Sequence, residues 1–231
     1  MSVSFDLGVL ATEVTEIDAF GDMASKLGLR GFTIVGLQSE PLKTITENLQ
    51  ICNRVILHGN NINSVRKQID KIRRRAMIVS VPLRSIDVVN WAAEDKRVDF
   101  LTVDPTQDNR LRDTTARLAS ITNTYLEIQI APLLQSSGLN RSKLLKSYRE
   151  SVSTAMDAGM GVVLTSGAIR PMGLRSSVAM AHIGILLGMD RAYADSAVSS
   201  IPKSIIERNT KKLQPGFVSN GVEILQKGDE K

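Results

Sequence analysis

The chain has 231 residues, of which 42% are hydrophobic and 23% are charged, an ordinary composition for a globular protein. A single cysteine excludes an intrachain disulfide and a multi-thiolate zinc site, and two histidines exclude a histidine-rich metal centre. The net charge of +5 would attract a polyanion, although many proteins reach this charge without binding one. The sequence shows neither a signal-peptide pattern nor an apolar stretch long enough to cross a bilayer, so we expect a cytoplasmic protein with no membrane partner.

Short apolar runs alternate with amphipathic stretches from end to end. In the first run, Phe5, Leu7 and Val9 fall on one side and Asp6 and Gly8 on the other, the alternation of a strand. We predict strands at residues 4–10, 31–35, 54–58, 76–81, 99–103, 125–130 and 161–165, and a weaker one at 221–225. We predict helices at residues 13–27, 42–50, 63–75, 85–93, 110–120, 141–158, 175–187, 191–199 and 202–213.

Seven or eight βα units with short links predict one domain at residues 1–225, followed by a charged tail at 226–231. Both an open doubly wound sheet and a (β/α) barrel supply the crossovers that parallel strands need. Inward-pointing polar residues recur on successive strands, whereas an open sheet buried on both faces would be more uniformly apolar. No GxGxxG sequence follows the first strand. We therefore predict an α/β fold, a compact and somewhat irregular TIM-like barrel.

The C-terminal ends of the strands are the functional face of such a barrel. Asp6, His58, Asp104 and Glu127 are candidates there for an acid–base or metal site, because Mg²⁺ and Mn²⁺ prefer oxygen ligands. The alternative is that these side chains are solvated polar ends and hydrogen-bonded interior groups. Neither His-x-His nor His-x-x-x-His occurs in the sequence, which favours that alternative.

A second candidate is the turn at residues 164–168, after the seventh predicted strand. Barrels often bind phosphate at this position through backbone N–H groups, and Arg170 and Arg175 follow the turn. The alternative is a tight turn in which Gly167 is needed for the backbone conformation. Arg84, after the fourth strand, lies on the same predicted face.

Basic residues also gather on two predicted outer helices. Arg66, Lys67, Arg73 and Arg74 follow the polar face of the helix at 63–75. A second cluster contains Arg208, Lys211 and Lys212. These faces are either simply solvated or bind nucleic acid, and with few aromatic residues any RNA contact would be mainly to phosphates.

Several short motifs carry a family resemblance through their order and spacing. They lie at residues 6–10, 26–32, 97–102, 125–128, 163–168, 174–176, 186–189 and 201–209. Together they resemble the protein component 3 family of archaeal ribonuclease P, which is related to the thirty-kilodalton subunit of the eukaryotic enzyme. The resemblance extends from about residue 4 to residue 225. The commoner sequence pattern in this family has a proline where this chain has Ser177.

The resemblance implies a subunit of the ribonucleoprotein that removes the 5′ leader of precursor tRNA. The RNA subunit would carry the catalysis with Mg²⁺, and this chain would bind no cofactor and cleave nothing by itself. Its partners would be the ribonuclease P RNA, precursor tRNA, protein component 2 and the other protein subunits. The fold is also similar to metal-dependent phosphoesterases of the polymerase-and-histidinol-phosphatase type. Their first strand carries His-x-His, whereas this chain has Asp6, Leu7 and Gly8 there.

By family position, Ser166, Gly167, Arg175 and Arg208 are expected to contact RNA or to shape the loop that does. The remaining candidates for RNA binding are Arg66, Lys67, Arg73, Arg74, Arg84 and Arg170. The sequence leaves two other functions open. One is a phosphoesterase that uses the barrel mouth, and the other is a protein scaffold that does not contact RNA.

Overall fold

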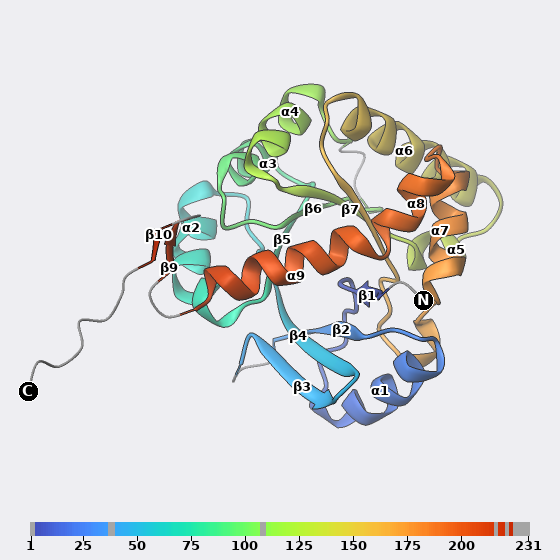
Figure 1. Ribbon diagram of the computed structural model, residues 1–231. Helices are drawn as coiled ribbons and strands as arrows, with labels where there is room; N and C mark the ends of the chain where they lie inside the picture. Colours follow the sequence, from blue (N-terminus) through green and yellow to red (C-terminus); the bar gives the residue numbers. More distant parts are fainter. Residues whose placement is uncertain (1–2, 37–39, 107–109, 215–216, 220–221, 224–231) are drawn as a thin grey trace, which may run out of the picture.

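A parallel sheet curves into a nearly closed barrel at the centre of the molecule (Figure 1). The computed structural model describes residues 3–36, 40–106, 110–214, 217–219 and 222–223. Within them, the strands of the barrel follow one another in the order β1-β2-β4-β5-β6-β7-β8, each parallel to its neighbour. They are β1 (Phe5–Asp6), β2 (Gly31–Val35), β4 (Leu49–Ile56), β5 (Ile78–Pro82), β6 (Phe100–Thr102), β7 (Tyr125–Gln129) and β8 (Val162–Thr165).

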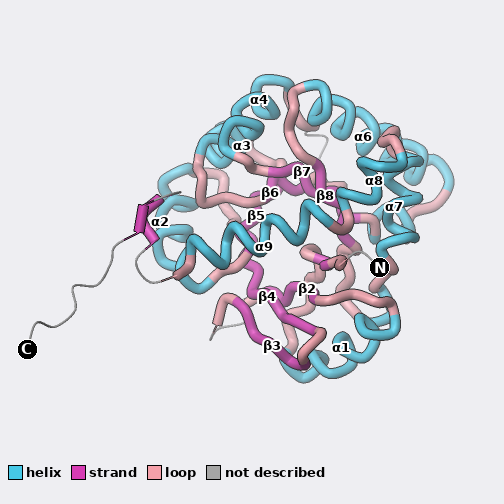
Figure 2. Tube along the Cα trace, viewed as in Figure 1, coloured by secondary structure: helices cyan, strands magenta, loops and turns pink. Residues whose placement is uncertain are grey.

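Helices form the outer layer around the strands, as the colours of Figure 2 show. They are α1 (Ile17–Lys26), α2 (Ile62–Ile72), α3 (Ile86–Glu94), α4 (Asp113–Thr122), α5 (Ala131–Gln135), α6 (Gly138–Asp157), α7 (Ser177–Leu186), α8 (Arg191–Ala197) and α9 (Ser200–Lys212). Short 3-10 turns are η1 (Val14–Glu16), η2 (Arg73–Arg75) and η3 (Pro171–Gly173). The prediction of a TIM-like barrel is confirmed. In the described part of the chain, each helix is too short or too polar to cross a membrane.

Polar residues point into the barrel from every strand of the parallel series. The largest of these buried side chains are Arg54 on β4 and Glu127 on β7, which are 0% exposed. The others in the series are Asp6, Thr33, Ser80, Thr102 and Thr165. The recurrence of inward-pointing polar residues, which favours a barrel over an open sheet, is therefore present in the structure.

The predicted helix at residues 42–50 is wrong. Residues Leu42–Thr46 form strand β3, which pairs antiparallel with β4 at the edge of the sheet. The β-branched side chains of Thr44, Ile45 and Thr46 favour an extended backbone. A turn at residues 47–48 then reverses the chain, and the backbone N–H of Asn48 donates to Thr46 Oγ1 at 3.3 Å.

The first and last strands of the barrel meet without a strand ladder among the described residues. The Leu10 N–H donates to the Ala168 carbonyl at 2.8 Å. Further inside, the Ser166 N–H donates to Asp6 Oδ1 at 3.1 Å. These two hydrogen bonds close the barrel between β1 and the turn that follows β8.

Helix α9 runs across one end of the barrel (Figure 1). Its buried Ile205 and Ile206 share a hydrophobic cluster with Phe5, Ile78 and Phe100, the first residues of three strands. The end that α9 covers is therefore the N-terminal end, and the C-terminal ends of the strands form the opposite face.

Near the C-terminus, β9 (Phe217–Ser219) pairs antiparallel with β10 (Val222–Glu223). The second of these strands falls within the predicted strand at 221–225, of which residues 221 and 224–225 lie outside the described residues. The predicted tail at 226–231 also lies outside them, and the single domain at 1–225 stays a prediction.

Candidate functional site

A buried ion pair occupies the interior of the barrel, where the sequence offers candidates for an acid–base or metal site. Arg54 reaches across from β4 and donates to both carboxylate oxygens of Glu127 at 2.6 Å. The side chains are 1% and 0% exposed. Thr102 and Thr165 also donate to this carboxylate, at 2.5 and 3.0 Å. Glu127 is therefore a saturated acceptor.

The guanidinium of Arg54 is held from several sides. It donates to the Leu7 carbonyl at 2.6 Å and to Ser80 Oγ at 3.1 Å. Its Cζ lies 5.7 Å from the centre of the Phe100 ring, within the range of a cation–π contact. A Cβ atom on Gly8 would meet Thr165 and would come within 2.8 Å of Glu127 Oε1, so glycine is needed at this close approach.

Asp6 lies beside this ion pair and is fully buried. Its Oδ1 accepts from the N–H groups of Gly8 and Ser166, at 3.2 and 3.1 Å, whereas its Oδ2 has no hydrogen-bond partner within the described ranges. Burial raises the pKa of Asp6, repulsion by Glu127 adds to that rise, and the hydrogen bonds from Ser166 and Gly8 oppose it. This carboxyl group connects β1 to the turn after β8.

The other two members of the predicted acid–base site lie elsewhere. Asp104, after β6, accepts a hydrogen bond from Arg84 Nε at 2.5 Å. Burial alone would raise the pKa of Asp104, but hydrogen bonds from Thr106 and Arg84 outweigh burial and lower it. His58 is exposed, at the end of β4. No group of three potential metal ligands occurs in the described residues.

The turn after β8 is buried. Ser166 is 0% exposed, and its Oγ accepts from the Ala168 N–H at 3.0 Å. Gly167 has a φ of +67°, and a Cβ there would lie 3.1 Å from the Cβ of Gln129. The structure therefore gives Ser166 and Gly167 a structural role in the turn, and their contact with RNA stays a prediction.

Two arginines follow the turn, as expected. Arg170 is exposed, whereas Arg175 is half-buried and its Nη1 donates to the carbonyls of Met172 and Leu174, at 2.9 and 2.7 Å. These bonds fix the loop that leads to α7. The helix begins at Ser177, the position where the family commonly has proline, and Ser176 Oγ caps it by accepting from the Ala179 N–H.

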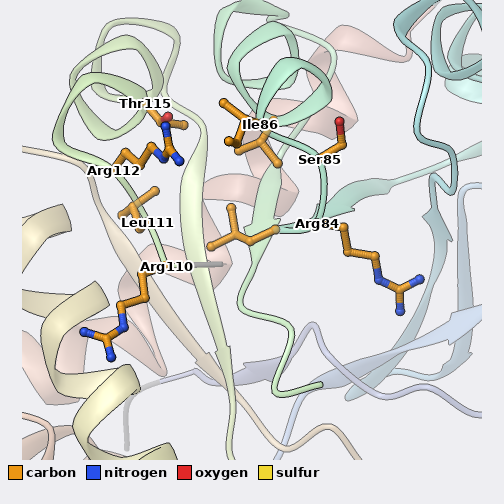
Figure 3. Close-up of a pocket in the computed structure, with 9 residues that line it drawn as sticks. Arg84, Ser85, Ile86, Arg110, Leu111, Arg112 and Thr115 are labelled. Atoms are coloured by element: carbon orange, nitrogen blue, oxygen red, sulfur yellow. The ribbon is translucent and has the colours of Figure 1, made fainter. Parts of the chain in front are cut away.

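A second group of cations, of which the sequence singled out only Arg84, lies near the C-terminal ends of the strands. Arg84, Arg110 and Arg112 line a cavity of about 250 Å³ between the N-termini of α3 and α4 (Figure 3). Arg110 also lines a neighbouring groove of about 660 Å³, together with Lys143 and Lys146 of α6. We call these five residues the upper basic surface. Their position after strands β5 and β6, or near the start of α6, is the signal that could have identified them.

The remaining predicted residues lie on α2 and at the N-terminal end of the barrel. Arg66 and Lys67 are exposed on α2, and the Arg66 guanidinium lies 5.7 Å from the centre of the Trp91 ring. Arg73, Arg74 and Arg208 line one groove at the end that α9 covers. Arg208 also donates to the buried Asp99 at 2.6 Å and to the Asn123 carbonyl at 2.8 Å.

These features define a TIM-like barrel whose interior is filled by an ion pair and whose outer cations gather at its two ends. Comparison with known proteins then identifies the family. The model of the family described as RNase P subunit p30 matches residues 21–214. The chain belongs to this family, which confirms the resemblance found in the sequence.

Curated relatives agree with this assignment. Ribonuclease P protein component 3 of Methanosarcina barkeri is 28% identical over 219 residues, with 92% of this chain and 91% of the relative covered. The protein of the same name from Methanothermobacter thermautotrophicus is 26% identical over 216 residues, with 87% of each covered. The prediction of a ribonuclease P subunit is confirmed over the alternative of a phosphoesterase.

Solved structures share the fold. A chain in a cryo-EM structure of archaeal ribonuclease P with mature tRNA aligns with a TM-score of 0.79 and 18% identity, covering 98% of this chain and all of the other. An amidohydrolase crystal structure aligns less closely, with a TM-score of 0.55 and 11% identity over 91% of this chain and 75% of the other.

Proposed function

We propose that this subunit binds and supports the catalytic RNA of ribonuclease P while the RNA, with its own Mg²⁺, cleaves the 5′ leader from precursor tRNA. The chain itself breaks no bond and holds no cofactor. It works in the cytoplasm with protein component 2 and the other protein subunits of the particle.

The pairing of carboxylates with arginines is the observation that carries this proposal. A general acid or base needs a carboxyl group free to exchange a proton with substrate. Glu127 is committed to Arg54, and Asp104 is committed to Arg84. Asp6 is paired with no arginine in the described residues, but it is fully buried and its Oδ1 accepts from two backbone N–H groups of the fold. The chemistry of the interior therefore supports a structural role, whereas the cations on the outer faces suit the phosphates of RNA.

The upper basic surface is one place for such contacts. Two helix N-termini and the side chains of Arg84, Arg110 and Arg112 face the same cavity (Figure 3). Helix N-termini favour anions because their backbone N–H groups lack partners within the helix. Figure 3 shows the Arg84 guanidinium directed away from the other two arginines, so the three charges do not form one tight cluster.

The test is the reconstituted particle, assayed for precursor tRNA cleavage with and without this chain across a series of Mg²⁺ concentrations. The chain should lower the Mg²⁺ concentration needed for half-maximal cleavage, because its cations offset phosphate repulsion in the folded RNA. The chain without the RNA subunit should show no cleavage. Cleavage of precursor tRNA by the isolated chain would overturn the proposal.

A variant links this activity to a named residue. Arg175→Ala should reduce cleavage by the reconstituted particle at low Mg²⁺, because Arg175 holds the loop before α7 and carries one of the charges predicted to contact RNA. The matched control is Arg191→Ala, on the exposed start of α8. Equal cleavage by the two variants would remove Arg175 from the RNA-binding residues.

A further inference from the structure

Six cations line a groove of about 620 Å³ at the N-terminal end of the barrel, on the face opposite the upper basic surface. A volume of this size is typical of ligand sites. The cations come from η2, from the connection between α3 and β6, and from α9. We call this feature the basal groove, and its cations are Arg73, Arg74, Lys96, Arg97, Arg208 and Lys212.

Carboxylates compensate only part of this charge. Asp99, buried beneath the groove, pairs with Arg208 at 2.6 Å and lies 3.7 Å from Arg73. Arg97 pairs with Asp70 and Asp95, at 2.5 and 2.7 Å. These pairs fix the geometry of three guanidinium groups.

The other three cations form no ion pair among the described residues. Arg74 and Lys96 are exposed, and the Lys212 Nζ donates to the Lys96 carbonyl, at 3.2 Å. Burial lowers the pKa of Lys212 to about 8, and the nearby positive charges of Arg208, Arg73 and Lys96 add to the effect, whereas Asp99 opposes it. The groove therefore holds like charges close together, and an anion bound there would relieve their repulsion.

The basic character continues beyond the groove along η2 and α2, where Arg75 and Lys71 are exposed. Lys211 on α9 is also exposed and lines a neighbouring pocket. A row of cations longer than the groove matches a polymer with regularly spaced negative charges better than a single small anion. Within a ribonuclease P subunit, that polymer is RNA.

We propose that the basal groove binds the phosphate backbone of RNA. This inference rests on the proposed function and adds a second contact face to the subunit. The bases are not read, because the lining offers charge and few aromatic side chains, so binding depends on phosphate spacing and on salt.

The double variant Arg74→Gln/Lys96→Gln tests this inference, because both side chains are exposed and form no ion pair in the part of the chain that the structure describes. The matched control is Lys26→Gln/Lys43→Gln, which removes two exposed charges from α1 and β3, away from the groove. Binding of the ribonuclease P RNA to the chain is measured across a range of salt concentrations. Melting curves check that both variants fold as the wild type does.

The basal variant should bind RNA more weakly at low salt. The negative slope of log K against log salt should become less steep, by about 0.7–0.9 for each phosphate that the variant no longer neutralises. The control should keep the wild-type slope. Equal slopes for both variants would overturn the inference. Weaker binding to the other protein subunits with an unchanged RNA slope would also overturn it, because the groove would then hold an acidic peptide.

The RNA-binding measurements, taken together with the cleavage assay of the reconstituted particle, separate this inference from the proposed function. If the proposed function fails, the wild-type chain does not stimulate cleavage in the reconstituted particle. If only the basal groove is wrong, the wild-type chain stimulates cleavage and binds RNA, and the basal variant behaves as the control does.

Discussion

Arg54 and Glu127 show how charged side chains can fill the interior of a (β/α) barrel. Each group has left water, and the cost of that transfer is offset only because each has the other as a partner and further hydrogen bonds besides. A charge without a partner at this position would lower the free energy of unfolding. The pair therefore stabilises the fold only as a unit, which makes its energetic coupling measurable.

Glu127→Gln should lower the free energy of unfolding by about 3–5 kcal/mol, because Arg54 would keep a buried charge without a counter-ion. Adding Arg54→Met should recover part of this stability. Urea unfolding measures both. Asp113→Asn is the control, since its ion pair with Arg117 is exposed and screened by solvent. A decrease for Glu127→Gln no larger than the control's would contradict the coupling.

Lys212, which lines the basal groove, makes the free energy of unfolding of the chain depend on pH. Its pKa is about 8 in the folded chain, against 10.5 as the ordinary value. Between these values the unfolded chain binds the proton and the folded chain does not, so this residue makes stability rise with pH. Arg208, Arg73, Lys96 and Asp99 act on it in the folded state.

The free energy of unfolding of the wild type, minus that of Lys212→Met, should therefore increase from about pH 8 to about pH 10.5. Denaturant unfolding at several pH values measures this difference, which cancels the titration of groups common to both proteins. Lys211→Met, at an exposed neighbouring position, should follow the wild type. A difference that stays constant with pH would show that the Lys212 proton is not linked to folding.

At the scale of elements, α9 has one apolar face and one cationic face. Ile205 and Ile206 pack on the first residues of the strands, and Arg208 and Lys212 lie at the basal groove. The sequence predicts this helix to within one or two residues of its observed ends, because its periodicity is strong. It does not predict that the helix covers the barrel, since that position depends on contacts with strands distant in sequence.

Ile205→Ala should reduce the free energy of unfolding by about 2–5 kcal/mol, because the side chain is 0% exposed and its removal leaves a cavity at the end of the barrel. Thermal or urea unfolding measures this. Met172→Ala is the control, since Met172 is 76% exposed and its replacement should change stability by less than about 0.5 kcal/mol. If the two variants were destabilised to a similar extent, α9 would not be closing the barrel.

The hairpin of β3 and β4 shows why the pattern of a short segment predicts secondary structure less well than a long periodic pattern does. Residues 42–50 contain apolar side chains at spacings that fit a short helix. The β-branched Thr44, Ile45 and Thr46 instead continue the sheet, since β4 offers an unpaired edge. The partner strand β4 begins directly after the turn, so the extended backbone of β3 depends on a hairpin pairing that the apolar spacing does not show.

For the whole molecule, the sequence was sufficient for the fold, the approximate positions of most strands and the family. It was less informative about which basic side chains are free to bind RNA and which are held by other residues of the chain. Arg208 was predicted to contact RNA, and the structure shows its guanidinium also held by Asp99 and Asn123. Ser166 is expected to contact RNA or to shape the loop that does, and the structure shows it buried in the turn. These distinctions depend on partners that lie far apart in sequence.

The two-faced character of α9 has a mechanical consequence for the particle. A phosphate held by Arg208 or Lys212 is connected to the barrel through the packing of Ile205 and Ile206. Any transient detachment of α9 would therefore open the N-terminal end of the barrel and, at the same time, release RNA bound in the proposed basal groove. Protection of this segment from hydrogen exchange and the residence time of the RNA at this end should thus rise and fall together.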